Sequence, residues 1–138
     1  MRAERSRPTV LLVEDDPTLG AILGKNLEAR GYRVTRASTL AQALVALDAE
    51  SPRVMLLDIN LPDGSGWDVL RALNVRGRRV PTVVLSAVQV SRSRLGEFRP
   101  EACLPKPFPL EALLATVARL TRGAAAPASA GAAPAVAG

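Results

Sequence analysis

The sequence contains no histidine and only one cysteine among its 138 residues. Without histidine, the chain has no Ser-His or Cys-His nucleophile pair, no histidine-ligated zinc and no phosphohistidine of its own. A single cysteine excludes an internal disulfide and a CxxC redox or metal site. These absences rule out the active sites of many hydrolases, zinc enzymes and thiol oxidoreductases.

Aromatic residues and long apolar runs are also scarce. Aromatics make up 3% of the chain, which leaves no stacking platform for single-stranded nucleic acid. The longest apolar runs, such as residues 10–13 and 54–57, are too short to span a bilayer. Residues 1–7 are charged and lack the apolar stretch of a signal peptide. We therefore expect a cytoplasmic protein that does not contact a membrane.

The formal net charge of +5 does not by itself indicate nucleic-acid binding. Part of the excess lies in residues 1–7, and Arg76, Arg78 and Arg79 form a small basic cluster that we interpret as a solvated loop. With so few aromatics, nucleic-acid binding through this domain is not expected.

Composition divides the chain into one domain with two short ends. Residues 1–7 are expected to form a flexible head, and residues 8–122 a single folded domain. Residues 123–138 carry no charge, no aromatic and no large aliphatic residue except Val136. Because such a segment buries too little apolar surface to offset its ordering entropy, we expect a disordered tail or linker with no DNA-binding domain.

Short apolar runs alternate with segments of helical period within residues 8–122. The runs predict strands at residues 9–13, 33–36, 53–57, 80–85 and 102–104. Asp16 and Pro17 are a helix start, and Gly96 and Pro100 interrupt the fourth helix, which is expected to be short or irregular. Five strand–helix units predict a doubly wound (βα)5 α/β fold with a five-stranded parallel sheet of order 2-1-3-4-5.

Polar residues follow the predicted strands at the sheet edge where such folds bind ligands. Glu14 and Asp15 follow the first strand, Asp58 ends the third, Ser86 ends the fourth and Lys106 follows the fifth. With the first and third strands adjacent, the three carboxylates converge. Clustered carboxylates repel one another unless a cation neutralises them, and an all-oxygen ligand set favours Mg2+. A carboxylate beside Mg2+ and a lysine also suits a phosphoryl acceptor.

Four motifs in this order resemble the receiver domain of bacterial response regulators. They are VEDD at residues 13–16, LLDINLPDGSG at residues 56–66, Ser86-Ala87 and Lys106-Pro107. The resemblance covers residues 9–122. It implies a signalling domain and not an enzyme. A histidine kinase or a histidine phosphotransfer protein is expected to phosphorylate this domain and thereby control a protein–protein interaction.

The resemblance implies that Asp58 is the phosphoacceptor, while Ser86 and Lys106 hold phosphoryl oxygens. It also implies that the peptide bond between Lys106 and Pro107 is cis, which X-Pro bonds allow.

The resemblance further implies the Mg2+ ligands. Asp15, Asp58 and the backbone carbonyl of Asn60 are expected to ligate the ion directly, and Glu14 through water. Asp16 is interpreted as a helix N-cap, because it directly precedes Pro17.

Asp63 and Asp68 are interpreted as solvated turn and helix residues.

The sequence departs from the family at the switch region. Cys103 stands three residues before Lys106, where most receivers have Tyr or Phe, and the spacing from Ser86 to Lys106 is about two residues short. We therefore expect the usual relay from Ser86 to an aromatic residue to be altered. Neither Asn60 nor Val88 supplies a general base for water, so slow self-dephosphorylation is expected.

Two other functions are compatible with the fold. The first is a receiver-like docking module that works without phosphorylation. The second is an Asp-nucleophile phosphatase of the haloacid-dehalogenase type, but those enzymes carry a second Asp two residues after the nucleophile, where this chain has Asn60.

Overall fold

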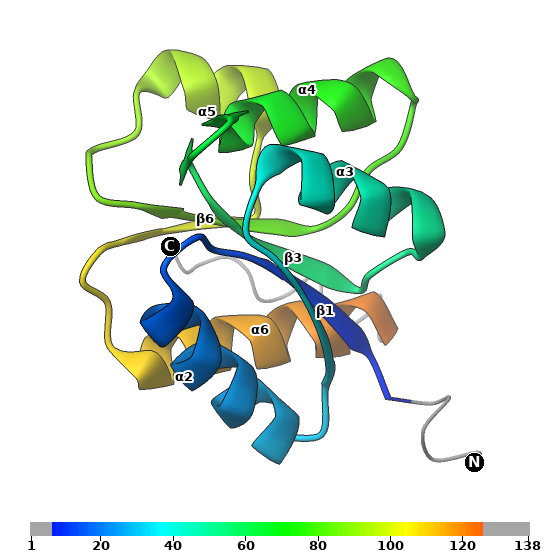
Figure 1. Ribbon diagram of the computed structural model, residues 1–138, viewed down its shortest axis with the longest axis vertical. Coiled ribbons are helices and arrows are strands. Elements are labelled where there is room, and N and C mark those ends of the chain that lie inside the picture. The colour runs from blue at the N-terminus through cyan, green and yellow to red at the C-terminus, as the bar shows by residue number, and fades with distance from the viewer. Residues whose placement is uncertain (1–6, 126–138) are drawn as a thin grey trace.

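A computed structural model describes residues 7–125, and within that range five parallel strands form one sheet in the order β2-β1-β3-β6-β7 (Figure 1). The strands are β1 (Thr9–Val13), β2 (Arg33–Ala37), β3 (Val54–Asp58), β6 (Thr82–Ser86) and β7 (Ala102–Pro105). In chain order this arrangement is 2-1-3-4-5, so the predicted doubly wound parallel sheet is confirmed.

Helices cover both faces of the sheet (Figure 1). Helices α2 (Pro17–Ala29) and α6 (Leu110–Ala125) lie on one face, and α3 (Leu40–Ala49), α4 (Gly66–Val75) and α5 (Arg92–Phe98) lie on the other. Alternate residues of β1 serve the two cores, since Val10 and Leu12 pack toward α2 and α6, while Leu11 and Val13 pack toward α3 and α4. This burial on both faces explains why the strands read as continuous apolar runs.

The helix ends agree with the sequence signals except at the C-terminus. Asp16 caps α2 by accepting hydrogen bonds from the amides of Thr18 and Leu19, and α5 is short, with seven residues. Helix α6 continues to Ala125, three residues into the segment whose composition favours a tail, because alanine favours helix continuation. Residues 1–6 and 126–138, which include most of the expected head and tail, lie outside the described residues. None of the described helices has the length and apolar character of a membrane span.

A small hairpin follows β3. Strands β4 (Asn60–Leu61) and β5 (Gly64–Ser65) pair antiparallel. Asp63, at the hairpin turn, accepts hydrogen bonds from the first two amides of α3, those of Leu40 at 2.6 Å and Ala41 at 3.0 Å. Asp63 is exposed, as expected of a turn residue. Its hydrogen bonds also join the hairpin to α3.

Asp68 also bonds to the start of a helix, in this case α4. It forms a capping box with Ser65 at the start of α4 and an exposed ion pair with Arg71.

The basic cluster lies in the loop between α4 and β6, where Arg76 and Arg79 are exposed as expected, and it also contacts neighbouring elements. Arg76 pairs with Asp48, Arg78 donates to the carbonyl of Leu47, and Arg79 pairs with Glu101. Arg79 also donates to the carbonyl of Arg99, the C-cap of α5, so Arg78 and Arg79 each bond to a carbonyl at the C-terminal end of a helix, where a cation is favoured.

Candidate metal and phosphoryl site

Three carboxylates meet at the carboxyl ends of β1 and β3. The two strands are hydrogen-bonded neighbours, with Val13 opposite Leu57, so the residues that follow them lie side by side. One ligand oxygen from each of Glu14, Asp15 and Asp58 lies within 4.8 Å of the others. Glu14 and Asp58 are buried, at 3% and 5% exposure, whereas Asp15 is exposed. The site therefore combines two desolvated carboxylates with one that faces solvent.

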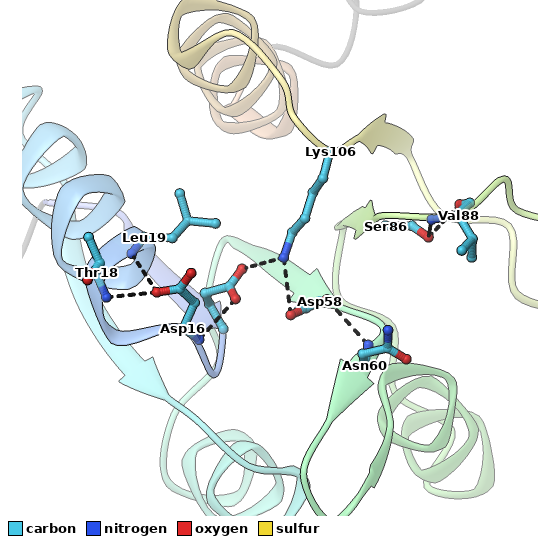
Figure 2. A network of polar contacts seen from close by, with 9 residues as sticks. Asp16, Thr18, Leu19, Asp58, Asn60, Ser86, Val88 and Lys106 are labelled. Atoms are coloured by element: carbon cyan, nitrogen blue, oxygen red, sulfur yellow. Dashed lines mark hydrogen bonds and ion pairs between the residues drawn. The ribbon is translucent and has the colours of Figure 1, made fainter.

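Lys106 supplies a positive charge to the two buried carboxylates. Its ammonium nitrogen lies 3.0 Å from Oε1 of Glu14 and 3.3 Å from Oδ2 of Asp58 (Figure 2). The residue follows β7 at the same sheet edge, and its backbone amide donates to the carbonyl of Ser86 at 2.8 Å. The Lys106–Pro107 peptide bond is cis, as the resemblance implies. One cation thus faces three acids, which leaves the site electronegative.

The environment shifts the pKa values of the central ion pair. Burial raises the pKa of Glu14, and the charge of Asp58 adds to the rise, while hydrogen bonds from Lys106 and the amide of Asp16 lower it; the net shift is upward. For Lys106, burial lowers the pKa, but the hydrogen bond to Glu14 and the charge of Asp58 outweigh burial, so its pKa is raised. The lysine therefore remains a cation at neutral pH.

The backbone after Asp58 is packed against the start of α4. Oδ1 of Asp58 accepts from the amide of Asn60 at 3.3 Å, and the amide of Gly66 donates to the carbonyl of Ile59 at 2.7 Å. A Cβ at Gly66 would lie 2.5 Å from the carbonyl oxygen of Asp58. Only glycine allows α4 to begin this close to Asp58.

Ser86 lies at the same edge, but its hydroxyl bonds to its own loop. It donates to the carbonyl of Val88 at 2.6 Å and accepts from the amide of Val88 at 3.1 Å. In Figure 2 these two contacts stand apart from those that join Lys106 and Asp58. The structure therefore brings Glu14, Asp15, Asp58 and Lys106 together, with Ser86 nearby but turned to Val88.

An aromatic stack, which the sequence pattern does not reveal, lies beside this loop. The rings of Trp67 in α4 and Phe98 in α5 stack at 5.3 Å between centroids, and the Arg94 guanidinium lies 5.7 Å from the centre of Trp67. Trp67 and Arg94, together with Ser86 and Val88, line a groove of about 200 Å3. At helical spacing these aromatics are indistinguishable from ordinary core residues, so only the fold shows their contact.

Cys103 lies half-buried in β7, opposite Val84 in the strand register, and packs against the core on the α3–α5 face. Burial raises the pKa of its thiol, so the thiol stays protonated and unreactive at neutral pH.

Comparison with known proteins agrees with this geometry. Residues 10–118 match the family described as the response regulator receiver domain. The transcriptional regulatory protein KdpE of Mycobacterium tuberculosis is 40% identical over 116 residues, which cover 82% of this chain and 50% of KdpE. Response regulator MprA of Mycobacterium ulcerans is 34% identical over 115 residues, with 82% and 50% coverage. The chain spans about half the length of these relatives.

Solved structures of receiver domains share the fold. The non-phosphorylated HemR receiver domain of Leptospira biflexa superposes with a TM-score of 0.77 at 33% identity, covering 83% of this chain and 94% of that domain. Response regulator TrrA of Thermotoga maritima, solved in complex with Mg2+ and BeF, gives a TM-score of 0.73 at 25% identity, with 82% and 98% coverage.

The ion network predicts opposite shifts for two substitutions in metal-free protein. Lys106→Met should raise the pKa of Glu14, because a hydrogen bond that favours the ionised carboxylate is lost. Asp58→Asn should lower that pKa, because a neighbouring negative charge is removed. Carboxyl-carbon NMR titration of Glu14 measures both values. Shifts in the same direction for the two variants would contradict the network.

Proposed function

Because the chain belongs to the response-regulator receiver family, we propose that Asp58 accepts a phosphoryl group and that this modification controls binding of a partner protein. The contact that carries the proposal is the one between the Lys106 ammonium and Oδ2 of Asp58, 3.3 Å apart. It places a fixed cation next to an anionic nucleophile at the edge of the sheet, where incoming phosphoryl oxygens bring further negative charge.

Each residue of the site has a separate role in the phosphoryl transfer. A carboxylate oxygen of Asp58 forms a bond to phosphorus while the bond from phosphorus to the donor nitrogen breaks, and the electron pair of that bond stays with the nitrogen. Lys106 balances charge on the transferred oxygens, and Ser86 donates a hydrogen bond to one of them after leaving Val88. The domain thus assists its own phosphorylation without being an enzyme.

The donor set fits Mg2+, because the site offers oxygens and no histidine or thiolate. We propose that Asp15, Asp58 and the backbone carbonyl of Asn60 hold the ion directly. Glu14 is proposed to act through water; its Oε1 accepts from Lys106 and its Oε2 from the amide of Asp16 at 3.1 Å. When bound, Mg2+ neutralises charge on the phosphoryl oxygens.

These 138 residues contain no histidine, so the phosphohistidine donor lies outside them. Response regulators of two-component systems signal with histidine kinases, and we propose a histidine kinase or a histidine phosphotransfer protein as the donor. Since relatives such as KdpE are named transcriptional regulatory proteins and are about twice as long as the match, we further propose a cytoplasmic role in gene regulation, exerted through a partner or a further domain.

Phosphorylation of Asp58 is tested by intact-mass spectrometry after incubation with Mg2+ and acetyl phosphate. Wild type and Asp48→Asn, a control on α3 away from the site, should each gain one phosphoryl group, whereas Asp58→Asn should gain none. Omitting Mg2+ should abolish the gain. An unmodified wild-type protein, under conditions that modify another receiver, would instead favour a docking module independent of phosphorylation. A phosphorylated Asp58→Asn protein would assign the acceptor elsewhere.

We also propose slow hydrolysis of phosphorylated Asp58, because neither Asn60 nor Val88 offers a general base. Val88 is 68% exposed, so it tolerates replacement. Val88→Glu should speed the loss of the phosphoryl mass after donor removal, by up to about 100-fold, whereas Val88→Leu should not. Equal and rapid loss in wild type and both variants would disprove the explanation.

We propose that the signal reaches α5 through the loop that starts at Ser86. Ser86 reaches a phosphoryl oxygen only by releasing Val88, and the loop leads directly into Ser91, the N-cap of α5. Movement of α5 changes the contact between Arg94 and Trp67. This route does not require an aromatic residue at position 103, where the chain has Cys103.

Trp67 is the only tryptophan in the chain, so its fluorescence reports on this route. Phosphorylation should change the emission of wild type and of Ser86→Thr, which keeps the hydroxyl. It should leave the emission of Ser86→Ala nearly unchanged, although mass spectrometry shows Asp58 phosphorylated. Equal changes in all three proteins, or none in phosphorylated wild type, would exclude the route.

A further inference from the structure

Asp63 connects the loop that follows Asp58 to a helix across the sheet edge. Its two carboxylate oxygens accept from the amides of Leu40 at 2.6 Å and Ala41 at 3.0 Å, which are the first two residues of α3. These amides have no partner within the helix. A carboxylate at a helix N-terminus is also favoured by the helix dipole. The attachment is therefore both directional and charge-assisted.

Helix α3, to which Asp63 bonds, is anchored in the core. Ala43 and Leu47 anchor α3 in the core at 0% and 1% exposure. Thr39 caps the helix from its own side by accepting from the amide of Gln42. The hydrogen bonds to Leu40 and Ala41 lower the pKa of Asp63, so the carboxylate is charged and the attachment intact at neutral pH.

The β4–β5 hairpin connects Asp63 to Asn60 at the proposed metal site. Asp63 lies in the turn between β4 and β5, and the pairing of Leu61 with Gly64 and of Asn60 with Ser65 leads from the turn back to Asn60. The side of the hairpin near Gly64 also lies close against Leu40, where a Cβ would be 2.8 Å from that side chain. Asn60 itself is exposed, so core packing of its side chain does not hold its backbone.

We propose that Asp63 is a positioning residue for Mg2+: by tying the β4–β5 hairpin to α3, it holds the backbone carbonyl of Asn60 where the ion requires it. This inference rests on the proposed function, in which that carbonyl is a ligand. Residues that orient metal ligands contribute strongly to affinity although they do not touch the metal.

The test is Mg2+ titration by isothermal calorimetry of wild type, Asp63→Ala, Asp63→Asn and Thr39→Ala. Asp63→Ala should weaken Mg2+ binding by about tenfold, and Asp63→Asn, which keeps one acceptor oxygen, by less. Thr39→Ala removes a cap from the same end of α3 but leaves the hairpin attachment intact, so it should bind Mg2+ like wild type. Circular dichroism confirms that each variant is folded at the titration temperature.

A merely structural role for Asp63 predicts another result. In that case Asp63→Ala and Thr39→Ala would lower the thermal midpoint alike and leave the Mg2+ affinity unchanged, or change it equally; either outcome overturns the inference. Failure of wild type to bind Mg2+ would instead refute the metal site, and with it the proposed function. An effect of Asp63→Ala that is absent from Thr39→Ala supports the positioning role.

Discussion

The ammonium of Lys106 between Glu14 and Asp58 is the interaction on which the site depends. Two buried carboxylates side by side are costly unless a cation satisfies them, and Lys106 reaches both within 3.3 Å. The contact ties the segment after β7 to the ends of β1 and β3. It also pre-positions the charge that a phosphoryl group requires, so that the same ion pair that stabilises the resting domain prepares it for reaction.

Two segments connect this charged centre to the rest of the domain. The loop that begins at Ser86 leads to α5 and to the stacked rings of Trp67 and Phe98. The hairpin after Asp58 leads through Asp63 to α3. Both start from residues that end a central strand, because parallel strands deliver all their carboxyl ends to one edge. The segments beside Asp58 are thus each connected to a helix on the same face of the sheet.

Much of the fold follows from local patterns. The doubly wound sheet, the Asp16 cap and the short fourth helix are confirmed, because continuous apolar runs and helix starts are local signals. The β4–β5 hairpin, the attachment of Asp63 to α3 and the pairing of Arg76 with Asp48 were not predicted. Each joins residues that are near in space but carry only generic turn or surface patterns in sequence, and Ala125 continues a helix into a segment whose composition favours a tail.

The sequence alone determined the fold class, the strand-end positions of Glu14, Asp15, Asp58, Ser86 and Lys106, and the absence of a histidine donor in the chain. Only the tertiary structure decided how these groups pair: Lys106 bonds to Glu14 as well as Asp58, and Ser86 turns to Val88. Periodicity places a residue at a strand end, but hydrogen-bond partners depend on side-chain direction and burial, which arise only when separate segments pack together.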